Sequence, residues 1–162
     1  MRIIGIDPGT GILGFGVIEI DSKNQPHLVD AGVIRTPVKE DDAVRLHTIY
    51  NELSEIIAST KPKEMAVEKL FFAQNVTTAM TVAQARGVVL LCGMQKGMKI
   101  AEYTPLQIKQ SITGYGRADK KQIQEMVRIQ LGLSEVPQPD DCADALAAAL
   151  THASTCRFTQ AS

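Results

Sequence analysis

An apolar run that stops at an acid and a Pro-Gly turn constrains the fold of this chain most strongly. Residues 2–7 read RIIGID, a short β-branched segment typical of a buried strand, and Pro8-Gly9 end it. The next segment, GTGILG, matches the glycine fingerprint of dinucleotide-binding folds. That fingerprint needs a helix N-terminus to hold a pyrophosphate, but residues 15–20 continue as FGVIEI, which favours a strand. We therefore expect a hairpin, whose tight turn with positive φ would explain the glycines.

Hydrophobic periodicity along the rest of the chain predicts an α/β fold. A strand near residues 15–20 and another over residues 27–36 follow the first through short connections, which predicts an antiparallel meander. Two more buried strands are expected over residues 65–70 and 98–103. Three-and-four spacing and terminal signals predict helices over residues 42–61, 76–96, 105–112, 119–131 and 140–155. Together these elements predict a mixed five-stranded sheet flanked by helices, in a single domain covering residues 1–162.

Composition excludes several broad classes of protein. The 162 residues include 44% hydrophobic and 22% charged side chains, as in ordinary globular proteins. The formal net charge of -1 argues against coating nucleic acid by bulk charge, although a local basic face would be compatible with it. The longest apolar run covers residues 87–94, well short of the ~20 residues that span a bilayer, and the N-terminus does not resemble a signal peptide. We therefore expect a cytoplasmic protein without a membrane partner.

The cysteines and histidines show no spacing typical of a zinc site. Cys92, Cys142 and Cys156 are far apart, and the three histidines are scattered among them. We interpret the cysteines as small buried hydrophobic residues in a reducing compartment.

Two carboxylates come at the ends of predicted strands. Asp7 ends the first strand and Glu68 ends the apolar run over residues 65–67, so they would face the same crevice if the strands are neighbours. Asp7 could instead form an Asx-turn ahead of Pro8, and Glu68 could pair with Lys69 or lie exposed.

Three more acids open the last predicted helix. Asp141 and Asp144 share a helix face, but so do Asp140 and Asp144, and spacing alone does not choose between the first two. Acids in a first turn often only favour the helix dipole. However, Asp144 is flanked by Ala145, Ala147 and Ala148 where a solvated face would carry long polar side chains, which predicts close packing around the acid.

Four such carboxylates, without histidine or cysteine, are typical of a site for hard divalent cations. Mg²⁺ is the expected cofactor, with Mn²⁺ as a substitute, and two ions in one site would suit phosphodiester hydrolysis. Carboxylate pairs also cleave glycosides, but sugar sites usually offer stacking aromatics, and this chain has three Tyr and four Phe and no Trp.

A local basic segment accompanies the acids. Residues 96–128 carry seven basic and three acidic side chains, and without the four proposed metal ligands the whole chain would have a charge of +3. Such a surface suits phosphate binding, although ordinary solvated helix faces explain it as well. Phe71 and Phe72 follow Glu68 closely and could insert into distorted nucleic acid or pack in the core.

Four segments in this order resemble the RuvC family of bacterial crossover (Holliday) junction endodeoxyribonucleases. They are IDPGT at residues 6–10, EKLFFAQN at 68–75, QARG at 84–87 and DCADAL at 141–146. The resemblance implies an RNase H-like fold and a homodimer that makes paired, symmetric, Mg²⁺-dependent nicks in four-way DNA junctions during recombination and repair. It also implies RuvA and RuvB as partners.

The resemblance also assigns roles to particular residues. It makes Asp7, Glu68, Asp141 and Asp144 the catalytic metal ligands, and so favours Asp141 over Asp140. It matches Phe71 to the aromatic residue that opens the junction. Lys109 and Lys120 match functionally important lysines that contact DNA, while Asp140 and Lys121 are extra charges beside these positions.

Three alternatives remain open from the sequence. A related RNase H-like nuclease of the YqgF type would act on structured RNA. An actin-like or sugar-kinase phosphotransferase shares the loop over residues 7–10 but normally needs two such domains. A junction-binding module without catalysis is the third. The apolar segment over residues 88–92 fits either deep burial or a two-fold helix interface.

Overall fold

A mixed five-stranded sheet forms the centre of the computed structural model, which describes residues 1–69 and 76–160. The strands are β1 (Arg2–Asp7), β2 (Ile12–Ile20), β3 (Pro26–Arg35), β4 (Glu64–Glu68) and β5 (Lys99–Tyr103), in the order β3-β2-β1-β4-β5. The first three strands are antiparallel, whereas β4 runs parallel to β1 and β5 runs parallel to β4. The predicted meander and the mixed sheet are confirmed.

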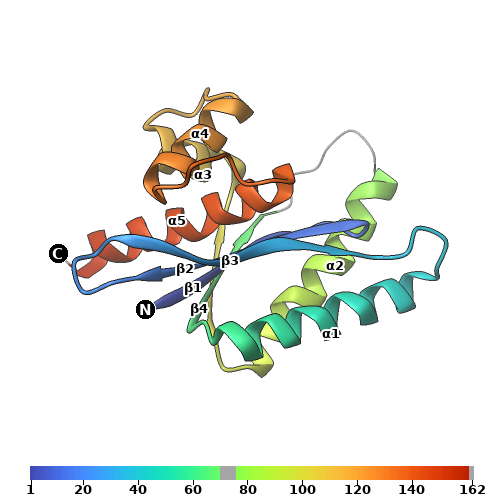
Figure 1. The fold of residues 1–162 in the computed structure, drawn as a ribbon. Coiled ribbons are helices and arrows are strands. Elements are labelled where there is room, and N and C mark those ends of the chain that lie inside the picture. Colours follow the sequence, from blue (N-terminus) through green and yellow to red (C-terminus); the bar gives the residue numbers. More distant parts are fainter. Residues whose placement is uncertain (70–75, 161–162) are drawn as a thin grey trace.

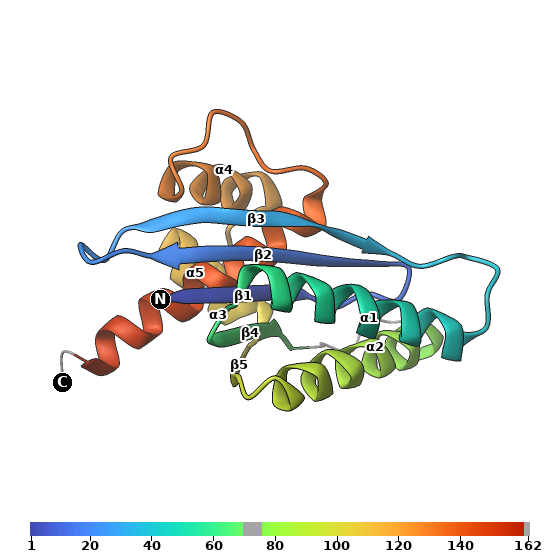
Figure 2. The same ribbon diagram turned by 60° about the horizontal axis from the view of Figure 1, so that its bottom comes forward.

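Helices cover both faces of this sheet. They are α1 (Asp42–Thr60), α2 (Val76–Gln95), α3 (Pro105–Thr113), α4 (Lys120–Gln130) and α5 (Asp140–Gln160). Figure 1 shows α5 lying on one face with α3 and α4 stacked beyond it, and α1 and α2 on the other face. Figure 2, turned toward that second face, shows α1 and α2 side by side across the strands. Alternating residues of β1 divide between the two layers, with Ile3 in the α5 core and Ile4 and Ile6 in the α1–α2 core.

Small residues let α5 lie directly on the sheet. A methyl group added at Gly5 of β1 would overlap the backbone of Ala145, and one added at Gly14 of β2 would overlap the carbonyl group of Asp141. On the helix side, Ala145 and Ala149 are fully buried. The backbone at the start of α5 is therefore held close to the end of β1 that carries Asp7.

The reason we expected for the glycines of residues 9–14 was wrong. The hairpin is present, but the glycines with positive φ in the described residues are Gly97, Gly114 and Gly132, which follow helices. Gly9 is instead needed because a side chain there would overlap the carbonyl of Ile12, and Gly14 because of α5. Close approach of backbone, not left-handed conformation, accounts for these two positions.

Two capping boxes fix the helices that face the site. Thr104 caps α3 and Asp119 caps α4, each with a reciprocal bond to a glutamine three residues later. The structure extends the last helix beyond the predicted end at residue 155 to Gln160, since no proline or glycine interrupts residues 140–160. It also ends β4 at Glu68, two residues before the predicted boundary.

Among the described helices, α2 is the one whose length and apolar composition would suit a membrane span. In this fold it packs beside α1 and against β5, and Ala85, Val89 and Cys92 belong to the core of that layer. The segment that fits either deep burial or a helix interface is buried on its inner side, at Val89 and Cys92, while Leu91 is 55% exposed.

Candidate functional site

Two neighbouring parallel strands bring the first two carboxylates together. In the ladder between β1 and β4, Ile6 lies opposite Val67, and Asp7 and Glu68 are the next residues on each strand. Both side chains are half-buried at the same edge of the sheet. We expected these two acids to face the same crevice if their strands are neighbours, and β1 and β4 are neighbours in the sheet.

The beginning of α5 adds two more carboxylates to this edge. Asp141 and Asp144 are both half-buried, and α5 packs on β1, β2 and β4. The flanking residues Ala145, Ala147 and Ala148 are fully buried, as the alanine pattern predicted. Close packing on both sides of α5 explains why small side chains surround the acid.

Asp140, which spacing alone could not separate from Asp141, points to a different helix. One of its carboxylate oxygens accepts a hydrogen bond from Gln124 of α4 at 2.9 Å, and the other lies 3.3 Å from the Lys120 ammonium. The side chain is 51% exposed. Asp141, by contrast, is close enough to Asp7 to raise the pKa of that carboxyl group.

Burial, together with repulsion between the acids, raises the pKa values of three members of the cluster. Burial raises the pKa of Asp7 from its usual 3.8 to about 8, with further contributions from the charges of Glu68, Asp144 and Asp141. Burial and the charge of Asp144 raise the pKa of Glu68 from 4.5 to about 7. The pKa of Asp144 is also raised, again chiefly by burial. The protein alone only partly offsets the negative charge of these acids. A bound cation would therefore stabilise their ionised forms.

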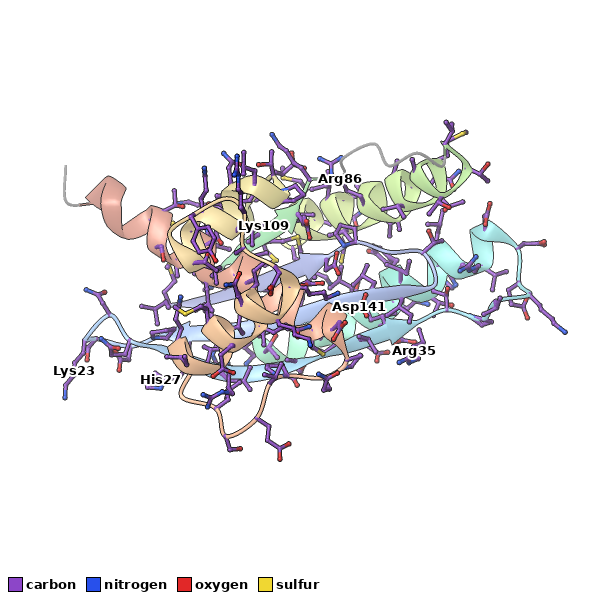
Figure 3. The ribbon with its side chains drawn as sticks, turned by 90° about the horizontal axis from the view of Figure 1, so that it is seen from above. Lys23, His27, Arg35, Arg86, Lys109 and Asp141 are labelled. Carbon is purple, nitrogen blue, oxygen red and sulfur yellow. The ribbon has the colours of Figure 1, made fainter. Side chains whose placement is uncertain are left out.

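Two lysines lie in the same cleft as the acids. A cavity of about 230 Å³ is lined by Glu68, Asp144, Lys109 of α3 and Lys120 of α4, together with Pro105, Ile108, Ile123 and Ala147. Figure 3, viewed onto the α3–α5 layer, places Lys109 and Asp141 on this side of the sheet. The two lysines predicted to contact DNA are therefore beside the predicted metal ligands.

Lys120 neutralises part of the acidic charge. Its ammonium lies 3.2 Å from Asp144 and 3.3 Å from Asp140. Burial opposes its charge, but the two aspartates raise the Lys120 pKa and keep it protonated. Lys121, one residue later, lines a separate cavity with Tyr115 and Glu125.

One predicted site residue lies outside the described residues, and one cluster escaped the sequence prediction. Phe71, like Phe72, belongs to residues 70–75, which the structure does not describe. Glu64, His152 and Cys156 converge at the start of β4, although the spacing of cysteines and histidines indicated no such group. A pairing of β4 with the later turns of α5 brings them together, and no local motif signals it.

Comparisons with known proteins agree with the geometry. Residues 3–152 match the family model described as "Crossover junction endodeoxyribonuclease RuvC". The chain is 53% identical over 152 residues to the RuvC of Fusobacterium nucleatum, covering 94% of this chain and 80% of that protein. The structure of Thermus thermophilus RuvC has a TM-score of 0.91 at 37% identity, with coverage of 98% and 97%. T. thermophilus RuvC in complex with a Holliday junction substrate gives 0.93 at 37%, with coverage of 98% and 96%.

The match covers nearly all of the chain and includes the strands and the helix that carry the four acids. The chain is more than half identical to a named RuvC, and it shares its fold with a RuvC of known structure over almost the full length. Both comparisons therefore point to the same family. The chain belongs to the RuvC family of crossover junction endodeoxyribonucleases.

Proposed function

We propose that this protein cleaves four-way (Holliday) DNA junctions by metal-dependent hydrolysis of phosphodiester bonds, in homologous recombination and repair. The observation that carries the proposal is the convergence of four carboxylates from β1, β4 and α5 beside a cleft lined by two lysines. A family member of known structure holds a Holliday junction substrate, and that supports the same substrate here.

The four acids fit a hard divalent cation. Family membership makes the protein a metal-dependent nuclease, and an all-carboxylate donor set favours Mg²⁺, with Mn²⁺ able to substitute. We assign Asp7, Glu68, Asp141 and Asp144 as the ligands of two ions. When bound, the ions would supply the positive charge that activates a water molecule and stabilises the leaving oxygen. The raised pKa values of Asp7 and Glu68 support this assignment, because a cation would offset the cost of burying their charges and their repulsion by Asp144.

The chain's own residues hold the substrate against this centre. Lys109 and Lys120 come from two helices that line the cleft, where their charges would balance the non-bridging oxygens of a phosphate. We assign to Phe71, a few residues after Glu68, the role of opening base pairs at the junction by stacking on a base. The 3′-oxygen would be the leaving group, so each nick would carry a 3′-hydroxyl and a 5′-phosphate.

A second copy of the chain is the proposed partner of α2. Arg86 is the one charged residue in α2, and it forms an ion pair with Glu102 of β5. The outer face of the helix carries Met80, Leu91 and Met94, which are 63%, 55% and 65% exposed. With Gly87 between them, these residues lie at intervals of seven, four and three positions, which is the heptad spacing of a helix-to-helix seam. A methyl group at Gly87 would meet nothing within 4 Å, so a partner helix has room to approach there.

The dimer has a direct test. Leu91→Glu should give a monomer in analytical ultracentrifugation, and cut junctions should lose their paired nicks. Ile129→Glu is the matched control, because Ile129 is 54% exposed on α4 and should leave the dimer intact. A monomeric wild-type protein, or a dimer unaffected by Leu91→Glu, would show that α2 does not form a dimer interface.

Two further parts of the proposal follow from the family. RuvA and RuvB, which drive branch migration, are the proposed protein partners, and the cytoplasm, where bacterial DNA lies, is the proposed location. Co-sedimentation with a RuvA-junction complex would test the first of these.

Substrate choice is tested with three nucleic acids of matched length. The protein is incubated with a mobile four-way junction, a linear duplex and a structured RNA, each with and without Mg²⁺. Metal-dependent symmetric nicks in the junction alone are the expected result. Faster cleavage of the RNA would favour the RNA-processing alternative, and binding without cleavage in Mg²⁺ or Mn²⁺ would favour a non-catalytic module.

A further inference from the structure

We propose that Glu64, His152 and Cys156 form a second metal site, specific for zinc or a similar transition metal, at the opposite end of β4 from the carboxylate cluster. Glu64 is the first residue of β4, and Glu68 in the candidate active site is the last. His152 and Cys156 lie one helical turn apart on α5. The proposal depends only on these residues and is independent of the function proposed above.

The three donor atoms are already arranged in a compact triangle. His152 Nε2 lies 2.6 Å from Glu64 Oε2 and 3.6 Å from Cys156 Sγ, and the sulfur lies 3.7 Å from the same carboxylate oxygen. A tetrahedral zinc ion with ordinary bond lengths separates nitrogen from sulfur by about 3.5 Å and nitrogen from oxygen by about 3.3 Å. The two distances to the sulfur match this geometry. Only the distance between Glu64 Oε2 and His152 Nε2 must increase when a metal binds.

A tyrosine holds the histidine in the orientation that metal binding needs. The Tyr103 hydroxyl lies 2.7 Å from His152 Nδ1, inside the core. The Glu64 carboxylate can only accept, so in the metal-free protein Nε2 donates to it and Nδ1 accepts from the tyrosine hydroxyl. A metal on Nε2 would take the place of that proton, and the imidazole proton would then lie on Nδ1, donating to the tyrosine oxygen. Zinc-binding histidines are usually fixed in this way by a partner on the second ring nitrogen.

The donor types separate this site from the carboxylate cluster. A thiolate and an imidazole select zinc over magnesium, whereas an all-carboxylate site favours magnesium. One carboxylate and one thiolate balance the charge of a divalent zinc ion, with the thiol proton released on binding. His152 is 7% exposed, while Glu64 and Cys156 are partly exposed, which leaves a path for the ion and for a water molecule as fourth ligand.

Zinc at this position would join two elements that also carry candidate catalytic acids. β4 ends in Glu68, and α5 begins with Asp141 and Asp144. A bond between the start of β4 and the third turn beyond Asp144 would hold the helix against the sheet. We therefore expect zinc to raise the melting temperature in a saturable way.

The test uses the full chain with excess Mg²⁺, which occupies the carboxylate cluster. Co²⁺ is added as a spectroscopic probe, and Zn²⁺ is then used to displace it. The expected result is a thiolate-to-cobalt charge-transfer band that saturates at one Co²⁺ per chain and disappears on Zn²⁺ addition. Cys156→Ser should abolish the band, and Tyr103→Phe should weaken Zn²⁺ binding about 10–100-fold.

Cys92→Ala provides the matched control, because Cys92 is buried in the layer on the other face of the sheet. It should keep both the band and the zinc-dependent rise in melting temperature. A wild-type protein without the band, or a band that survives Cys156→Ser or is lost in Cys92→Ala, would overturn the proposal. A folded Cys156→Ser protein can be verified by circular dichroism before either measurement.

Discussion

Asp7 should make the metal-free protein less stable as the pH rises. In the folded protein the pKa of Asp7 is about 8, against 3.8 for an ordinary aspartate. Between these values the folded state binds a proton that the unfolded state has lost, so the free energy of unfolding falls with increasing pH. This sign is opposite to that of an aspartate stabilised by a salt bridge.

The expected size follows from the two pKa values. From pH 5 to pH 8 the unfolded aspartate stays ionised while the folded one stays largely protonated until the end of the range. At about 1.4 kcal/mol per pH unit, the loss over this range is about 3–4 kcal/mol. Asp7→Asn removes the titrating group, so its free energy of unfolding should lose this part of the pH dependence and exceed that of the wild type at pH 8.

Urea denaturation in EDTA, at several values from pH 5 to pH 8, measures the effect. Asp30→Asn serves as a control because Asp30 is an exposed carboxylate on β3, and it should keep the wild-type slope. Mg²⁺ should reduce the slope more in the wild type than in Asp7→Asn, which keeps only the raised pKa values of Glu68 and Asp144, since the cation replaces the proton. An identical slope in wild type and Asp7→Asn would refute the reasoning.

Two further predictions concern the packing of α5 and the lysines of the cleft. Gly14→Ala should cost about 1–3 kcal/mol of stability and slow cleavage, because its methyl group would overlap the backbone of Asp141. Gly11→Ala, whose nearest contact is Arg45 at 3.5 Å, should change the free energy of unfolding by less than about 1 kcal/mol in the same urea assay. Lys120→Ala should slow junction cleavage at least about tenfold; equal rates for Lys120→Ala and Lys121→Ala would contradict its assigned role.

Periodicity and turn signals were sufficient to predict the sheet and most helix ends. The N-cap at Thr104, the cap at Asp119 and the stop at Gly97 all depend on neighbouring residues, so local sequence contains the information. Likewise, acids at the ends of two apolar strands could be paired because strand ends of a parallel pair meet at one edge. Helix spacing did not separate Asp141 from Asp140, and the hydrogen bond that Asp140 accepts from Gln124 of α4 depends on packing between two helices.

Features that depend on long-range packing could not be predicted in this way. The role of Gly14 comes from the backbone of α5, more than a hundred residues later in the chain. The cluster of Glu64 with His152 needs the register of α5 on β4, separated by 88 residues. Spacing rules for metal ligands assume local motifs, so they could not find it.

Asp144→Asn most directly tests the central claim that the carboxylate cluster binds the metal for junction cleavage. Junction binding is measured by fluorescence anisotropy in Ca²⁺, and cleavage of the same junction is measured in Mg²⁺. We predict junction affinity within about threefold of the wild type, with cleavage reduced by at least about 10². Asp140→Asn, which removes an exposed acid held by α4, should retain most of the activity. Normal cleavage by Asp144→Asn would contradict the account.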